Sequence, residues 1–221
     1  MTNRPIVYSF RRCPYAMRAR LALLISDTVC EIREIKLSTK PPEMIATSKK
    51  ATVPILILPD GQVIDESLDI MRWSLRNHDP EHWLDYEDSV LIATNDGDFK
   101  HHLDRFKYPG RYGTTPAEHR AAGLEYLKVL EARLVANGNL CSTTRSITDM
   151  AIMPFVRQFA ETDRAWFDTL PLPALQAWLA RHLASSLFSA AMVRLAPWRA
   201  EDSPVLFPAR AGKIAASLSA I

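Results

Sequence analysis

The chain has 221 residues, which exceeds one small domain but does not require three, so we expect one large domain or two smaller ones. Hydrophobic residues make up 48% and charged residues 24%, and 7 glycines against 15 prolines argue against a flexible, low-complexity chain. The net charge of +2 is too small for a typical nucleic-acid-binding surface, so we expect no nucleic-acid partner.

The first part of the chain alternates strand and helix patterns. Residues 6–10 form a short β-rich run, residues 16–26 place apolar side chains at helical spacing, and residues 29–37 return to β-rich character. This strand–helix–strand unit implies two parallel strands. The extended runs 53–58 and 62–67 then flank a Pro-Asp-Gly turn, which predicts an antiparallel hairpin.

The rest of the chain reads as helical. Residues 65–76 form a helix that completes the first 78 residues, and the acidic, Pro-containing segment 79–88 is expected to be a linker. Residues 89–221 show no convincing strand. The sequence therefore predicts an α/β domain over 1–78 and an all-α domain over 89–221, with no sheet strand from beyond residue 90.

Two helix boundaries in the second domain are marked by local signals. Residues 116–138 begin with a proline and end with Asn-Gly, a pair typical of a helix start and stop. Ser146 is followed three residues later by Asp149, which is close to a capping box at the start of a buried helix.

The three cysteines, Cys13, Cys30 and Cys141, are odd in number and unrelated in spacing, so we expect no disulfide framework and a reducing compartment. The apolar run near the N-terminus covers only residues 6–10, too short for a signal-peptide core. No run approaches the roughly 18 apolar residues of a membrane span. We therefore expect a soluble, cytoplasmic protein with no membrane partner.

Cys13 is the best candidate for a reactive group. It follows the first strand and precedes Pro14, which suits a first helical position, so Cys13 is expected to cap the helix. The helix dipole and the neighbouring arginines favour the thiolate, which is the nucleophilic form. Most free cysteines are buried and inert, and we assign Cys30 and Cys141 to that class.

Three motifs occur in a fixed order: CPYAMR at residues 13–18, ATVPIL at 51–56 and DESLDIM at 65–71. Together they resemble the N-terminal domain of the cytosolic glutathione transferases. The single cysteine, with Ala16 in place of the second cysteine of glutaredoxins, makes the chain most similar to the cysteine-type, omega-like members. The resemblance implies a thioredoxin-like domain followed by an all-helical domain, glutathione as co-substrate, and a homodimer.

The resemblance also implies the residues that bind glutathione. The bond between Val53 and Pro54 would be cis and would expose the Val53 backbone to the cysteinyl part. Ser67 and the helix start would take the γ-glutamyl carboxylate, and Glu66 its ammonium. From the residues alone, an ordinary strand-entry proline and a simple helix cap remain alternatives. The candidates for the glycyl carboxylate are Lys40, Lys49 and Lys50, of which we favour Lys40 by its position in the loop.

Aromatic residues are candidates for an acceptor pocket for a small-molecule substrate. They are Tyr15, Phe106, Tyr108 and Tyr112. For those after residue 99, packing between helices is an equal alternative. The adjacent His101 and His102 would point apart on a helix and have no partner four residues away, so we expect no metal site.

The sequence thus predicts a glutathione-dependent thiol transferase that uses Cys13 to reduce disulfides or remove glutathione from small substrates. One alternative is conventional conjugation of glutathione to electrophiles through the hydroxyl of Tyr8 or Ser9, as in other branches of the family. Another is a non-catalytic protein that keeps the fold for binding.

Overall fold

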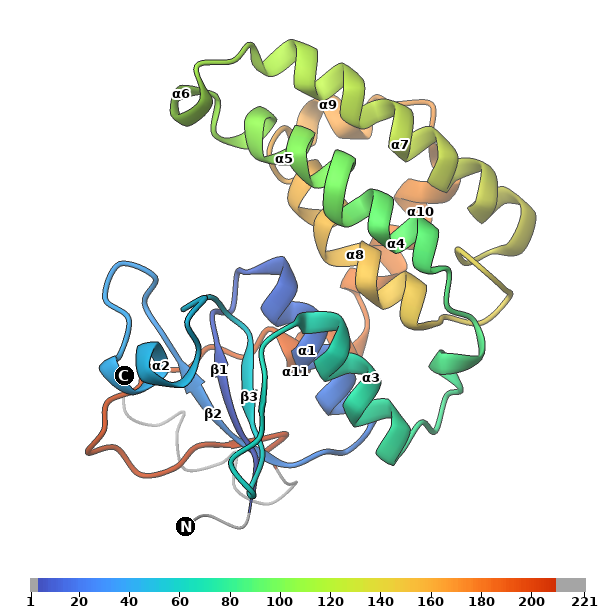
Figure 1. The fold of residues 1–221 in the computed structure, drawn as a ribbon. Coiled ribbons are helices and arrows are strands. Elements are labelled where there is room, and N and C mark those ends of the chain that lie inside the picture. Colours follow the sequence, from blue (N-terminus) through green and yellow to red (C-terminus); the bar gives the residue numbers. More distant parts are fainter. Residues whose placement is uncertain (1–3, 210–221) are drawn as a thin grey trace. The chain divides into compact units, whose positions relative to one another are not determined.

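The computed structural model describes residues 4–209, and this part of the chain divides into two compact units. The first unit consists of residues 4–80 and 186–209, and the second is Glu81–Ser185 (Figure 1). The first unit thus contains two segments that lie far apart in the sequence.

The first unit is built on a five-stranded sheet with the strand order β4-β3-β1-β2-β5. Its strands are β1 (Ile6–Ser9), β2 (Cys30–Glu34), β3 (Ile55–Ile57), β4 (Val63–Ile64) and β5 (Leu206–Phe207). Strands β1 and β2 are parallel, and β3 pairs antiparallel with both β1 and β4. The predicted strand–helix–strand unit and the hairpin are both confirmed.

Helices cover both faces of this sheet. Helices α1 (Pro14–Ile25) and α3 (Ser67–Asn77) lie on one side, and the short helix α2 (Pro42–Thr47) lies on the other (Figure 1). Successive side chains of a strand point to opposite faces, so Val7 joins one hydrophobic cluster and Tyr8 the other. This is the thioredoxin-like arrangement that the sequence predicts.

The end of the described chain corrects the expected domain boundary. Helix α11 (Ser186–Ala191) packs against α1, and β5 pairs antiparallel with β2, so the expectation of no strand from beyond residue 90 is wrong. A short β5 gives β2 a partner where its edge would otherwise leave N–H and C=O groups unpaired. The sequence pattern does not predict β5, because the strand spans only two residues and Pro208 follows it directly. Residues 210–221 of the expected second domain lie outside the described residues.

The second unit is helical. Its elements are η1 (Trp83–Asp85), α4 (Ser89–Thr94), η2 (Asn95–Phe99), α5 (Lys100–Lys107), α6 (Pro109–Tyr112), α7 (Pro116–Asn137), α8 (Ile147–Ala160), α9 (Arg164–Asp168) and α10 (Pro173–Leu183). Helix α7 ends at Gly138 in the left-handed region (φ 82°), as its stop signal predicts. Among the described helices, none combines the length and apolar character needed to cross a membrane.

The predicted capping box organises the centre of the helical unit. The Asp149 carboxylate accepts a hydrogen bond from the Ser146 backbone N–H over 3.0 Å. The same side chain accepts from the Trp178 indole N–H over 2.9 Å and from the Leu140 backbone N–H over 2.9 Å. Burial raises the pKa of Asp149, and these donors oppose that rise. The carboxylate therefore joins the start of α8 to α10 and to the chain before α8.

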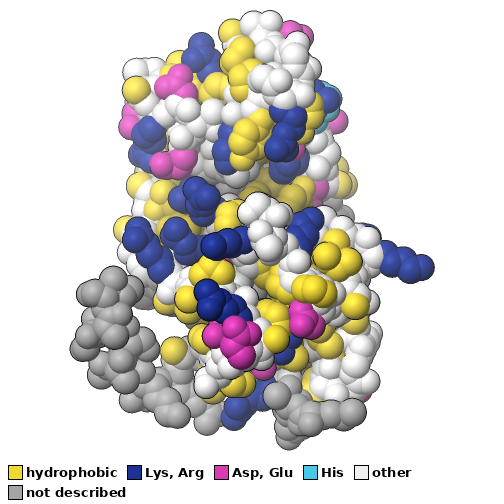
Figure 2. Space-filling model, turned by 90° about the vertical axis from the view of Figure 1, so that its left-hand side faces the viewer, with side chains coloured by type: hydrophobic (Ala, Val, Ile, Leu, Met, Phe, Trp, Pro, Cys, Tyr) yellow, Lys and Arg dark blue, Asp and Glu magenta, His cyan; other side chains and the backbone are white. Residues whose placement is uncertain are grey.

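The surface carries both signs of charge. On the face shown in Figure 2, Lys and Arg side chains lie among hydrophobic, Asp and Glu side chains and do not form one continuous basic area.

Candidate active site

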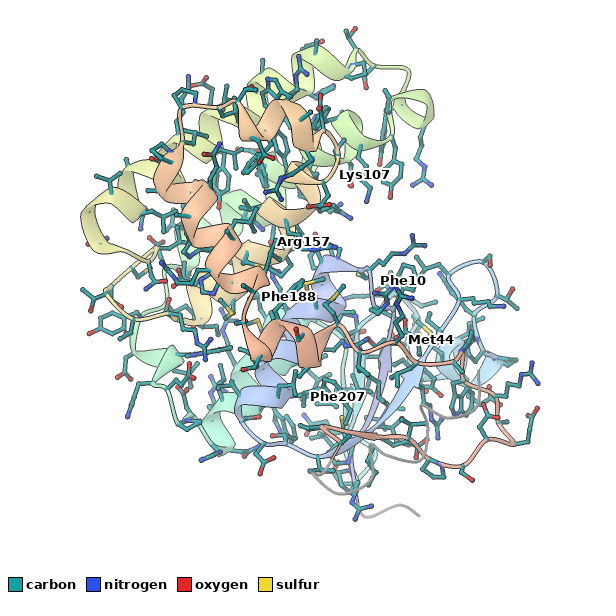
Figure 3. The ribbon with its side chains drawn as sticks, turned by 180° about the vertical axis from the view of Figure 1, so that it is seen from behind. Phe10, Met44, Lys107, Arg157, Phe188 and Phe207 are labelled. Atoms are coloured by element: carbon teal, nitrogen blue, oxygen red, sulfur yellow. The ribbon has the colours of Figure 1, made fainter. Side chains whose placement is uncertain are left out.

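Cys13 lies where the sequence predicts, at the start of α1. It is the N-cap residue with extended backbone (φ −73°, ψ 124°), and Pro14 follows it in the first turn. A hydrogen bond of 2.9 Å from the Cys13 N–H to the Phe10 carbonyl closes the turn after β1. Met44, labelled in Figure 3, belongs to a buried hydrophobic cluster, and the partly exposed Cys13 and Phe10 both pack against that cluster.

A buried carboxylate holds the turn that leads to Cys13. Glu34, at the end of β2, accepts a hydrogen bond from the Arg11 backbone N–H over 2.6 Å and another from Arg20 Nη1 over 3.2 Å. Burial raises the pKa of Glu34 against the effect of these donors. Glu34 is not among the residues that the sequence predicts for the site, because its only signal is an acidic side chain within a β-rich run.

Two arginines of α1 lie in the interior of the first unit. Arg18 and Arg20 are fully buried, and Arg20 forms an ion pair with Glu34. Arg20 also donates to the Val193 carbonyl over 3.1 Å, so it joins α1 to the returning C-terminal segment. Arg20 therefore serves the interior of the fold, because a buried guanidinium requires acceptors around it.

The turn before β3 brings a second part of the chain to Cys13. The Val53–Pro54 peptide bond is cis, as the resemblance implies. The Cys13 thiol lies 3.7 Å from the Val53 carbonyl oxygen, which it faces as a hydrogen-bond donor. Val53 is 7% exposed and packs into the same hydrophobic cluster as Cys13.

The start of α3 forms the third part of the candidate site. Glu66 is the N-cap residue and Ser67 the first helical residue, so free N–H groups of the helix start are near both side chains. Arg18 Nη1 donates to the Ser67 hydroxyl over 3.4 Å, and Ser67 is buried. This contact links α1 to α3, and sequence spacing does not predict it.

Of the three candidate lysines, Lys50 contacts Glu66 within the described part of the chain. Its ammonium donates to the Glu66 carboxylate and lies 3.6 Å from Asp65. The hydrogen bond that Lys50 donates to Glu66 is the main cause that raises the pKa of Lys50. Within residues 4–209, no hydrogen bond or ion pair joins Glu66 to Lys40, the lysine that the sequence favours. The backbone at Ala51 is left-handed (φ 46°), and this turn sets the position of Lys50.

The alternative hydroxyl groups are enclosed. Tyr8 and Ser9 are both fully buried. The Tyr8 hydroxyl accepts a hydrogen bond from Arg33 over 2.7 Å, and the Ser9 hydroxyl accepts from Arg20 over 3.4 Å. Burial raises the pKa of Tyr8. Both hydroxyl groups are therefore enclosed by the protein and engaged with arginine side chains.

The other two cysteines are in less reactive surroundings. Cys30 is fully buried in β2, and its thiol donates to the Phe207 carbonyl over 3.3 Å. Burial raises the pKa of Cys30 to about 12, so it remains a thiol at neutral pH. Burial also raises the pKa of Cys141. These surroundings agree with the assignment of both residues to the inert class.

The candidate acceptor residues divide into two groups. Phe106 is 7% exposed and packs against Phe159, with ring centroids 5.1 Å apart, so it belongs to the core of the helical unit. For Phe106, the structure therefore supports packing between helices, which was the alternative to a place in the acceptor pocket. Tyr108 and Tyr112 are exposed, with Arg111 and Arg105 over their respective rings, and Tyr15 is partly exposed with Arg18 over its ring.

A third imidazole approaches the two adjacent histidines, although no histidine lies four residues from either of them in the sequence. His101 and His102 lie at the start of α5, and His119 of α7 approaches them. Spacing within one helix could not reveal this neighbour, because the third imidazole comes from the next long helix of the chain.

Comparisons with known proteins agree for both halves of the chain. Residues 7–82 match the family "Glutathione S-transferase, N-terminal domain", and residues 101–181 match "Glutathione S-transferase, C-terminal domain". Among curated relatives, "Probable glutathione S-transferase parA" of Nicotiana tabacum is 28% identical over 176 residues, which cover 72% of this chain and 74% of the relative.

Solved structures share the fold. A glutathione S-transferase-I bound with lactoylglutathione has a TM-score of 0.69 and 21% identity, covering 86% of this chain and 98% of its own. A glutathione transferase family member from Pseudomonas fluorescens, with two glutathione bound, has a TM-score of 0.72 and 16% identity, covering 86% and 92%. At these identities the likeness concerns the fold alone.

Proposed function

Since this chain belongs to the glutathione S-transferase superfamily, with matches to both of its domains, we propose that it is a glutathione-dependent thiol transferase with Cys13 as the nucleophile. The observation that carries the proposal is the position of Cys13. Cys13 is the N-cap residue of α1, and its partly exposed thiol lies beside the cis Val53–Pro54 turn. A helix N-terminus favours the anionic form of a thiol, which is the form that reacts.

The reaction has two exchange steps. In the first, the Cys13 thiolate attacks the glutathionyl sulfur of a mixed disulfide, so a bond from Cys13 to that sulfur forms and the substrate leaves as a thiolate that takes a proton. In the second, the thiolate of another glutathione attacks the same glutathionyl sulfur, which forms oxidised glutathione and restores the Cys13 thiolate. Ala16 stands where a second cysteine would close an internal disulfide, so the route uses one protein thiol.

Three parts of the first unit would bind glutathione. The backbone of Val53 would pair with the cysteinyl part next to Cys13, which it already contacts. Ser67 and the free N–H groups of α3 would take the γ-glutamyl carboxylate, and Glu66 its ammonium. Arg18, through its hydrogen bond to Ser67, would position that hydroxyl.

Lys50 would take the glycyl carboxylate. In the structure it pairs with Glu66, and binding of the glutathione ammonium to Glu66 would release the Lys50 ammonium for another anion. This lysine replaces Lys40 as the favoured candidate because it contacts another residue of the proposed site. We also expect a cytoplasmic homodimer, as the resemblance to the superfamily implies.

Two parallel assays test this function. The first measures glutathione-dependent reduction of a mixed disulfide between glutathione and a small thiol. The second measures conjugation of glutathione to an aryl halide. The proposal expects the first activity to dominate and to disappear in Cys13→Ser, with Cys141→Ser as the matched control. Dominant conjugation that survives Cys13→Ser would favour a conventional transferase. Glutathione binding without either activity would favour a non-catalytic protein.

A further inference from the structure

Three imidazoles from two helices meet at the outer part of the helical unit. His101 and His102 come from the first turn of α5, and His119 from the first turn of α7. One nitrogen from each ring lies within 4.8 Å of the others. The Nδ1 atoms of His102 and His119 are only 2.9 Å apart.

Packing of the two helices holds these rings in place. On the same side of the helix pair, Phe99 stacks on Tyr126 with ring centroids 4.7 Å apart. Phe99 precedes His102 by one turn, and Tyr126 follows His119 by two turns, so the aromatic pair and the histidine pair lie along one seam. His119 is 7% exposed, whereas His101 is exposed. The cluster therefore has a rigid base and an open side.

We propose that His101, His102 and His119 bind a Zn²⁺ ion that joins α5 to α7. Neutral imidazole is a common zinc ligand, and three histidines with water in the fourth position are a known tetrahedral zinc arrangement. Zinc–nitrogen bonds of about 2.0–2.1 Å at tetrahedral angles place ligand nitrogens about 3.4 Å apart. The His102 and His119 nitrogens would separate by about 0.5 Å from their present distance, and His101 would turn toward them.

The charges around the cluster are compatible with a cation. At 2.9 Å, the facing His102 and His119 nitrogens share one proton in a hydrogen bond. Zinc would displace that proton from Nδ1, and the same imidazole would carry it on Nε2 instead, so both rings stay neutral. Asp98 acts electrostatically on His102 and contributes negative charge. Arg105 donates to His101 Nδ1 over 3.0 Å and would lose this bond. It also lies over the Tyr112 ring at 4.5 Å, so it keeps a partner when His101 turns.

Zinc bound here would fasten the helical hairpin. Residues 108–115, which include α6, connect α5 to α7, and the metal would bridge the two helices above this connection. A ligand that binds only the folded state raises the midpoint of thermal unfolding. This effect does not depend on the glutathione site, so it separates the two proposals.

Zinc titration of the untagged full-length chain tests the site. We expect one Zn²⁺ per chain by calorimetry, and a rise in the unfolding midpoint at saturating zinc. Loss of even an outer partner of a metal site typically lowers affinity 10–100-fold, so His101→Ala and His119→Gln should each weaken binding at least tenfold. His82→Ala is the matched control, because His82 is an exposed histidine of the same unit outside the cluster. It should bind zinc as the wild type does.

Cobalt spectroscopy of the same proteins identifies the ligands. Co²⁺ in the site should give the visible bands of a four-coordinate ion and no thiolate-to-metal charge-transfer band, and Cys13→Ser should leave the spectrum unchanged. A thiolate band that disappears in Cys13→Ser would overturn the proposal in favour of the cysteine. Unchanged zinc affinity in a folded His101→Ala would also overturn it, and folding of this variant is expected because His101 is exposed.

Discussion

The thiol of Cys13 lies 3.7 Å from the carbonyl oxygen of Val53, although the two residues are forty positions apart in the chain. This contact joins the start of α1 to the turn before β3. It places a potential nucleophile next to a segment of backbone that precedes a cis proline. A peptide substrate that paired with this backbone would bring its own sulfur to Cys13.

Replacing the thiol tests its role directly. We expect Cys13→Ser to abolish disulfide reduction, because a serine hydroxyl neither ionises near neutral pH nor forms an exchangeable mixed disulfide. Glutathione binding should survive. After treatment with oxidised glutathione, mass spectrometry should find the adduct on Cys13 in the wild type and in Cys141→Ser. An adduct found only on Cys30 or Cys141 would contradict the assignment.

Removing the Glu66 carboxylate should weaken glutathione binding. The loss of a charge-assisted contact predicts that Glu66→Ala lowers the affinity at least tenfold, or about 1.4 kcal/mol, by calorimetric titration. Asp69→Ala is the control, since Asp69 is an exposed acidic residue in the same turn of α3. Equal affinity in folded Glu66→Ala and wild type would remove Glu66 from the site.

Substitution of Lys50 and of Lys40 should affect glutathione binding differently. Lys50 contacts Glu66, so Lys50→Met should raise the dissociation constant for glutathione, and Lys40→Met should have a smaller effect. A lost charge-assisted contact to the glycyl carboxylate predicts a change of roughly tenfold for Lys50. Glutathione ethyl ester at the glycyl carboxylate should bind both Lys50→Met and wild type equally. A larger loss in Lys40→Met would restore the sequence-based choice.

Gly123 permits close packing of α7 on α8. A Cβ atom at this position would lie 2.5 Å from Cε2 of Phe159, whose ring is fully buried. Overpacking of this kind predicts that Gly123→Ala lowers the free energy of unfolding by about 1–3 kcal/mol in denaturant titration. Gly97→Ala, a helical glycine with no atom near an added Cβ, should keep or increase the stability. Equal stabilities of the two variants would contradict this packing.

His182 should make the protein sensitive to acid. Its Nε2 is buried without a hydrogen-bond partner among the described residues, and burial lowers the pKa of His182 to about 3. In the unfolded chain His182 therefore takes up a proton near pH ~6.5, whereas in the folded chain it stays neutral. The free energy of unfolding consequently falls as the pH drops from ~6.5 towards ~3. Between about pH 7 and pH 5 the loss is about 2 kcal/mol. His182→Phe should show a correspondingly flatter pH profile of the unfolding free energy, and a profile parallel to wild type would contradict the effect.

The sequence by itself determined the features that rest on local patterns. The strand, turn and Pro14 around Cys13 specify where α1 starts, and the hydrophobic spacing specifies the βαβ and hairpin units. The Ser146–Asp149 capping box is also local, because its two members are one helical turn apart. Such signals act between neighbours in the chain, so they can be read without knowledge of the fold.

Only the tertiary structure decided the contacts between distant segments. Lys50 rather than Lys40 contacts Glu66, Arg18 bonds to Ser67, and His119 joins two histidines of another helix. The strand β5 likewise forms because it pairs with the edge of β2, since a two-residue run beside a proline has no strand pattern of its own. These contacts depend on how helices and strands pack. Because that packing involves side chains that are remote in sequence, the local sequence pattern around a residue does not predict its contacts.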